Sequence, residues 1–100
     1  MTYEDFCEFY ATRIDKDDYG DFKEIVTPLH PCGDLCAMLY LSNLLPTKQR
    51  DFIGAAEHDA IYFCHDICEQ YHLFTEEDII YLLRCGVYHD KEVGSLMMYV

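Results

Sequence analysis

Apolar and polar residues recur at helical spacing in two stretches, one near each end of the chain. In residues 3–14 the apolar side chains fall on one helical face and the acidic ones on the other, and Thr2 stands at a cap position. In residues 76–84 a similar apolar face follows Thr75 and three acidic residues, and Gly86 suits a left-handed helix end. Each stretch therefore predicts an amphipathic helix.

The middle of the chain has a less regular pattern. Residues 35–45 are apolar on nearly all sides and predict a central buried helix, which Pro46 ends. Residues 47–57 predict a further helix. Its inward side chains are expected to be Phe52, Ile53 and Ala56. Residues 15–21 lack periodicity and predict a loop, and residues 22–29 predict either a short extended piece or a weak helix.

Strand-forming residues occur in short runs in the second half of the chain. Ala60–Cys64 predicts a strand, and residues 87–100 predict a hairpin that ends in the apolar run Leu96–Val100. Because an isolated hairpin is only marginally stable, we expect Ala60–Cys64 to pair antiparallel with Leu96–Val100. Asp66 and Glu69 have the spacing of a capping box, which predicts a short helix that runs from Asp66 to about His72. The fold class expected is α+β, a mainly helical single domain of residues 1–100 with a short antiparallel sheet.

Composition narrows the classes of function. The chain has 100 residues, 51% of them hydrophobic, which suits one compact core. Its 19 acidic and 7 basic residues give a net charge of −12, which argues against direct binding to nucleic acid or to an anionic membrane. Acidic residues interrupt the N-terminal turns, so no signal peptide is expected, and the longest apolar segment is too short to span a bilayer. We expect a cytoplasmic protein, working in the cytosol of a host cell.

No catalytic pattern is present in the sequence. The two serines, Ser42 and Ser95, lie outside any G-x-S-x-G motif, and there is no glycine-rich phosphate loop or H-E-x-x-H. Cys64 and His65 are adjacent on a predicted strand and so point to opposite faces. The cluster Glu57–His58–Asp59 is expected to form a polar corner between a helix and a strand. We therefore expect a protein that is not an enzyme and needs no cofactor.

A structural zinc site is the alternative to a chain without cofactors. Two cysteine pairs have a spacing of i, i+4, and two facing helices would bring four thiolates to one tetrahedral ion. The alternative ligands are Cys32, Cys36, Cys64 and Cys68. Zinc knuckles usually have a C-x2-C spacing, and in a reducing cytosol the cysteines are expected to remain thiols.

The block from Gly54 to the C-terminus contains GAAEHDAIYF, TEEDIIYLLRCGV and SLMMYV. It resembles the C-terminal part of small acidic proteins encoded in phages and prophages. The resemblance implies a small domain that acts by binding a host protein, as anti-CRISPR and antirestriction proteins do. It implies no particular functional residue. A structural or accessory phage protein without an inhibitory role is the alternative.

Charge is concentrated at the two ends of the chain. Residues 1–24 carry a net charge of −5 and residues 57–100 carry −7, whereas the middle is neutral. We expect these carboxylates to occupy a basic groove of a host nucleic-acid-binding protein or complex, as a DNA mimic does. The expected partner-binding residues are Asp15, Asp17, Asp18, Tyr19, Asp21, Glu76, Glu77 and Asp78. The alternative is that the acids keep the domain soluble and that residues 76–78 only stabilise a helix start.

Tyrosine is the other abundant residue that suits a binding surface. The chain has nine tyrosines, and tyrosine gives a large contact area at a low entropic cost and stacks on arginine. Those expected to be partly exposed are Tyr3, Tyr19, Tyr71, Tyr88 and Tyr99. Together with the apolar C-terminal run, they also make a homodimer possible.

Overall fold

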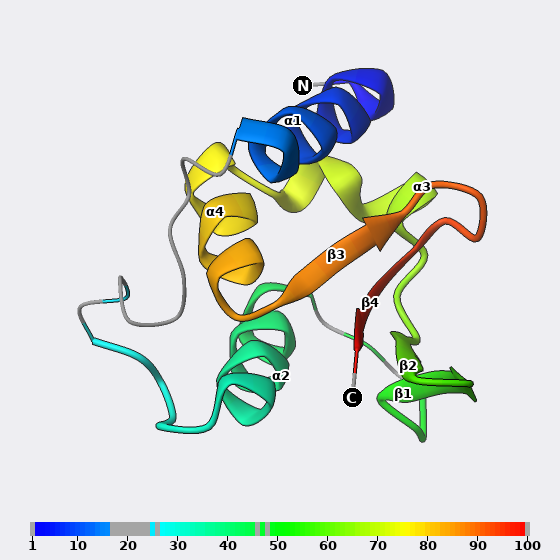
Figure 1. The fold of residues 1–100 in the computed structure, drawn as a ribbon. Coiled ribbons are helices and arrows are strands. Elements are labelled where there is room, and N and C mark those ends of the chain that lie inside the picture. The colour runs from blue at the N-terminus through cyan, green and yellow to red at the C-terminus, as the bar shows by residue number, and fades with distance from the viewer. Residues whose placement is uncertain (1, 17–24, 26, 46, 48, 100) are drawn as a thin grey trace.

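The computed structural model describes residues 2–16, 25, 27–45, 47 and 49–99, with the backbone alone for residues 13–16. Helices and strands follow one another in an α+β arrangement, with the sheet formed by the second half of the chain (Figure 1). The elements are α1 (Tyr3–Lys16), α2 (Gly33–Leu44), β1 (Ile53–Glu57), β2 (Ala60–Phe63), α3 (Ile67–Gln70), the 3-10 helix η2 (Tyr71–Leu73), α4 (Glu76–Arg84), β3 (Val87–Asp90) and β4 (Ser95–Tyr99).

The four strands form one antiparallel sheet in the order β1-β2-β4-β3. The register of β2 on β4 pairs Ile61 with Met98 and Tyr62 with Met97. This pairing confirms the predicted contact between Ala60–Cys64 and the C-terminal run, and the predicted hairpin is also present as β3 and β4. The α+β fold class is confirmed.

In the part of the chain that the structure describes, the helices cover one face of the sheet. Val87, Leu96 and Met98 are almost fully buried on the inner face, where β3 contacts α1 and α4. Since successive residues of a strand point to opposite faces, the row Tyr62, Met97 and Tyr88 lies on the outer face. The two faces therefore differ: one belongs to the core, and the other carries the half-buried Tyr62 and Tyr88 and the exposed Tyr99.

Helix α1 begins as predicted and is anchored to the core by aromatic residues. The Thr2 hydroxyl accepts a hydrogen bond of 3.1 Å from the Asp5 amide, which caps the helix. Phe6 is fully buried, and its ring contacts those of Phe74 and His89 with centroid separations of 5.2 and 5.1 Å. The helix continues to Lys16, so the predicted loop begins two residues too early. Its remaining part lies outside the described residues.

Helix α4 has the predicted start and end. Thr75 and Asp78 form a reciprocal capping box, and Ile79, Leu82 and Leu83 of the apolar face are buried. Gly86 follows the helix with a φ of 88°, in the left-handed region that favours glycine. The short helix predicted after Asp66 is also present, because the Asp66 side chain accepts a hydrogen bond from the Cys68 amide that opens α3.

The prediction of a helix over residues 47–57 is wrong. The structure has strand β1 at Ile53–Glu57, paired with β2, and all five of its residues are exposed rather than turned inward. An Ala-Ala-Glu sequence has a high intrinsic helix propensity, but the hydrogen bonds to β2 decide the conformation here. Residues 46 and 48 lie outside the description.

Two other predictions for the middle of the chain need correction. Helix α2 is not a buried central helix, because Leu35 and Leu39 are 44% and 45% exposed while Cys36 and Leu41 are buried. It covers the core with one face and leaves an apolar face open. Residues 25 and 27–29 form neither a helix nor a paired strand, so the weak helix is absent there, and residues 22–24 and 26 lie outside the described residues.

Candidate functional site

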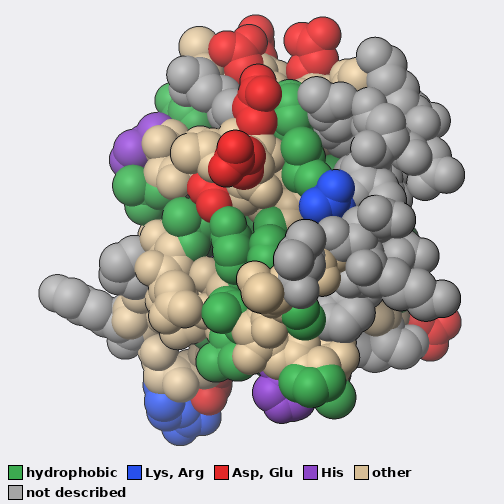
Figure 2. Space-filling view, turned by 90° about the vertical axis from the view of Figure 1, so that its left-hand side faces the viewer, with side chains coloured by type: hydrophobic (Ala, Val, Ile, Leu, Met, Phe, Trp, Pro, Cys, Tyr) green, Lys and Arg blue, Asp and Glu red, His purple; other side chains and the backbone are tan. Residues whose placement is uncertain are grey.

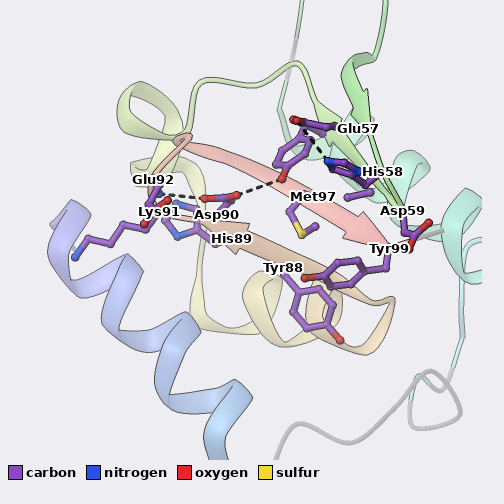
Figure 3. A pocket seen from close by; sticks show the side chains of 12 residues that line it. Glu57, His58, Asp59, Tyr88, His89, Asp90, Lys91, Glu92, Met97 and Tyr99 are labelled. Carbon is purple, nitrogen blue, oxygen red and sulfur yellow. Dashed lines mark hydrogen bonds and ion pairs between the residues drawn. The ribbon is translucent and has the colours of Figure 1, made fainter.

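The outer face of the sheet carries an open pocket of about 790 Å³. Its floor comes from strands β2, β3 and β4, and its rim comes from the β1–β2 and β3–β4 turns (Figure 3). The large side chains of the floor are those of Tyr62, Tyr88, Met97 and Tyr99. The rim residues are Glu57, His58, Asp59, Asp90, Lys91 and Glu92.

The pocket floor is aromatic because of the strand register. Tyr62 and Tyr88 both stand opposite Met97, one on each side of it, so the three side chains form a row across the sheet. Met97 is only 6% exposed, whereas Tyr99 is 67% exposed. The rings of Tyr88 and Tyr99 lie 5.9 Å apart at an angle of 54°, as Figure 3 shows. The prediction that Tyr99 is exposed is confirmed, and Tyr88 is half-buried.

The first part of the rim is the tight turn between β1 and β2. Glu57 pairs with Ala60, so only His58 and Asp59 form the loop. His58 has a φ of 56°, as a two-residue hairpin turn requires. Its Nε2 lies 3.9 Å from a carboxylate oxygen of Glu57. The polar corner expected at these residues is therefore a hairpin turn and not a helix-to-strand junction.

The second part of the rim is fixed by Asp90. One of its carboxylate oxygens, Oδ1, accepts hydrogen bonds from the amides of Glu92 and Val93 at 3.1 and 3.3 Å. The other, Oδ2, accepts a hydrogen bond of 3.3 Å from the Tyr62 hydroxyl. Burial and the charge of Asp90 raise the pKa of Tyr62, so this hydroxyl keeps its proton and donates.

The charge of the pocket is strongly negative. Four carboxylates, those of Glu57, Asp59, Asp90 and Glu92, line it together with one ammonium group. That group belongs to Lys91, whose side chain extends away from the tyrosine rings (Figure 3). A surface of tyrosine faces rimmed by carboxylates has the chemistry that recognises a cationic side chain.

His89 borders the pocket, but its ring belongs to the core side. It packs against Phe6 and Tyr10, and its Nε2 lies 3.3 Å from the Tyr3 hydroxyl. Burial lowers the pKa of His89, which favours its neutral form. His89 therefore supports strand β3 from behind.

The acidic residues predicted to bind a partner fall into two groups. Asp17, Asp18, Tyr19 and Asp21, and the side chain of Asp15, lie outside the described residues. The second group, Glu76, Glu77 and Asp78, forms the first turn of α4. Figure 2 shows that acidic side chains on this side of the molecule gather mainly in the upper part of the view, beside exposed hydrophobic ones.

Within the second group, Asp78 is committed to the fold. Its Oδ2 accepts hydrogen bonds of 2.8 Å from the Thr75 amide and 2.9 Å from the Thr75 hydroxyl, and its Oδ1 accepts one from the Tyr40 hydroxyl. Burial and the charge of Asp78 raise the pKa of Tyr40, which therefore stays a donor. Glu76 and Glu77 are exposed and remain available to a partner.

The cysteines proposed as alternative zinc ligands lie in different surroundings. Cys36 is buried, with Sγ 3.1 Å from the Tyr81 hydroxyl, and Cys64 lies 3.7 Å from the Thr47 hydroxyl. Cys32 and Cys68 are exposed. Within the described residues, no three His, Cys, Asp or Glu side chains converge on a position that would hold a metal ion.

Sequence reasoning missed the outer-face site, although the alternation of residues along the predicted strands carries part of the signal for it. Tyr62, Tyr88, Met97 and Tyr99 are outward residues of predicted strands, and two of them were expected to be partly exposed. Once the pairing of the strands is known, their alternation places them on one face.

Comparison of the chain with known protein families, with curated proteins and with solved structures finds no significant match. In the part of the chain that the structure describes, no helix is both long and apolar enough to cross a membrane.

Proposed function

We propose that this protein is a protein-binding module whose outer sheet face takes a cationic segment of a basic partner. The observation that carries the proposal is the tyrosine floor of the pocket, with Tyr99 exposed and four carboxylates around it. A cation above a tyrosine ring gains about 0.5–1 kcal/mol at an exposed site. The net charge of −12 adds steered association, which weakens as salt rises.

Arginine suits this pocket better than lysine does. A guanidinium group is planar, stacks on an aromatic ring and donates two parallel hydrogen bonds to a carboxylate. Tyr88 and Tyr99 offer ring faces, and Glu57 and Asp59 offer carboxylates on the rim at the β1–β2 turn (Figure 3). A lysine ammonium group makes the charge interaction but does not stack in the same way.

The finer proposal is that the partner is a host nucleic-acid-binding protein or complex and that the chain inhibits it. Arginines that normally meet phosphates would then meet the carboxylates of the pocket and of the α4 start, as in an anti-CRISPR or antirestriction protein. The excess of acidic residues supports this role, since it also argues against direct contact with nucleic acid.

The proposal is tested with an arginine-rich peptide, its lysine counterpart and calorimetry. We expect the arginine peptide to bind more tightly, and Tyr99→Ala to weaken it by about 1 kcal/mol, or about fivefold. Two charge-matched double variants locate the site: Glu57→Gln with Asp59→Asn, and Glu76→Gln with Glu77→Gln. Loss of binding in the second variant alone would assign the site to α4 and refute the proposal for the sheet.

The inhibitory role needs a separate measurement. A host lysate passed over the immobilised protein should yield a nucleic-acid-binding complex that elutes as salt rises, and the purified complex should lose its DNA or RNA when the chain is added. A complex that binds this chain and its nucleic acid together without competition would contradict inhibition by mimicry.

A further inference from the structure

Among the described residues, strand β1 forms an open edge of the sheet. The strand order places it beside β2 alone, at the end opposite β3, and every one of its five residues is exposed. Figure 1 shows the β1–β2 hairpin far from α1 and α4, which lie near β3. An edge strand carries a row of backbone N–H and C=O groups without strand partners, which is a ready template for another strand.

The register identifies which backbone groups face outward. Glu57 and Ala60 flank the two-residue turn. The residues that flank such a turn form a hydrogen-bonded pair. Since hydrogen-bonded and non-hydrogen-bonded pairs alternate along an antiparallel ladder, the pair of Ala56 with Ile61 is non-hydrogen-bonded. The N–H and C=O groups of Ala56 therefore point away from β2, into the open edge.

The side chains of β1 leave this edge accessible. Edge strands are commonly protected by lysine, by proline, by a β-bulge or by a covering element. The pairing of β1 with β2 shifts register between Ile53 and Ala55, so the regular part of the edge is residues 55–57. The sequence of β1 is IGAAE, in which Gly54, Ala55 and Ala56 are small and Glu57 carries the one charge. An added strand thus meets little steric hindrance and a single carboxylate.

We propose that β1 is a docking edge on which an extended segment of the basic partner pairs as a fifth strand, with a cationic side chain opposite Glu57. Glu57 belongs both to β1 and to the rim of the pocket, so a strand in this register presents its cationic side chains on the outer face. That the partner is basic rests on the proposed function. That β1 is an edge strand follows from the strand order alone.

Charge complementarity selects a cationic strand over a second copy of this chain. Glu57 and Asp59 stand at one end of β1, and at the other end Asp51 is ion-paired with Arg50 of the same chain at 3.2 Å. A second copy would bring together two molecules of net charge −12, whereas a strand with arginines is attracted.

The test uses three peptides. The first is an unmodified peptide of alternating arginine and valine. The other two carry N-methyl groups on every second backbone amide, one on the odd-numbered and one on the even-numbered residues, so that each has one edge blocked when it is extended. Calorimetry gives the affinity, and amide hydrogen exchange reports on Ala56. We expect the phase methylated on the pairing edge to bind about tenfold more weakly, since it loses backbone hydrogen bonds. The Ala56 amide should be protected by the unmodified peptide and by the other methylated phase, and not by the weakly binding one.

Each outcome decides between the two proposals. Equal affinity of all three peptides, without protection of Ala56, would overturn strand pairing and leave the cation-binding function standing. No binding of any of them would contradict both. Protection of Ala56 that depends on protein concentration without peptide would show a second copy on the edge and overturn the choice of partner.

A pair of variants gives an independent check. Ala56→Pro removes the outward N–H group without touching the ladder to β2, and Ala56→Val keeps that group in a residue that favours strands. The proline variant should bind the arginine–valine peptide about tenfold more weakly than the valine variant does. Should Ala56→Pro fail to fold, the methylated peptides decide the question with the unmodified protein.

Discussion

The Tyr62 hydroxyl donates a hydrogen bond of 3.3 Å to Asp90 across strand β4, which lies between the strands that carry the two residues. It ties the pocket floor to the β3–β4 turn. Tyr62→Phe should therefore lower the free energy of unfolding by about 1 kcal/mol, because Asp90 loses a donor in a half-buried position. Urea denaturation measures the change, and Tyr99→Phe, an exposed control, should have almost no effect. Equal effects would mean that the bond contributes nothing.

Acid should destabilise the protein through His65. The ring is 2% exposed, neither ring nitrogen has a hydrogen-bond partner among the described residues, and burial lowers the pKa of His65 from 6.5. The folded pKa lies below the unfolded one, so the unfolded chain takes up the proton first. Stability is then complete above about pH 6.5 and falls as the pH drops toward the folded pKa.

Urea denaturation between pH 7.5 and 5 measures this effect in the wild type and in His65→Leu. We expect the variant to lose less stability on acidification. It should still lose some, because the pKa of His89 is also lowered by burial. Parallel curves for the two proteins would show that His65 does not cause the pH dependence.

The first turn of α4 should separate acids that stabilise the fold from acids that are available for binding. Asp78→Ala removes the capping box and the acceptor of the Tyr40 hydroxyl, so it should cost about 1–2 kcal/mol of unfolding free energy. Glu76 lies in the same turn and is exposed, so Glu76→Gln should change the free energy of unfolding by at most about 0.5 kcal/mol. Thermal and urea unfolding of the two variants provide the comparison, and a similar cost for both would contradict the assignment.

Thiol reactivity should divide the six cysteines into groups. Cys32 and Cys68 are exposed, whereas burial raises the pKa of Cys85 to about 12 and hides its sulfur. A maleimide reagent at pH 7.5 should label Cys32 and Cys68 first, and Cys85 only after unfolding in urea. Peptide mass spectrometry after short exposures identifies the labelled positions, and early labelling of Cys85 would disprove its burial.

Much of the fold was accessible from the sequence where local signals and tertiary contacts agree. Thr75 and Gly86 delimit α4 by capping chemistry that acts within one or two turns, and the apolar run after Gly94 had few options besides pairing with β2. Residues 53–57 could not be assigned in this way. Their local preference is helical, and the hydrogen bonds that make them a strand come from residues 60–63, so the conformation depends on a partner segment.

The proposed binding surface was harder to predict than the fold. The run of three acidic residues predicted a partner site at the start of α4, yet Asp78 there caps the helix through its hydrogen bonds with Thr75. The pocket combines Glu57, Tyr62, Asp90 and Tyr99, which come together only through the register of three strand pairs. A register shift of one residue would turn these side chains to the other face, and no spacing rule encodes it.

The single-sided covering of the sheet separates two kinds of position along the same strands. Inward residues such as Leu96 and Met98 hold the molecule together, and their outward neighbour Tyr99 contributes little to that task. Substitutions at exposed outward positions such as Tyr99 are therefore expected to be tolerated individually, so a library of altered faces can be screened on one unchanged scaffold. Selectivity for new ligands should then be tunable without a matching loss of thermal tolerance.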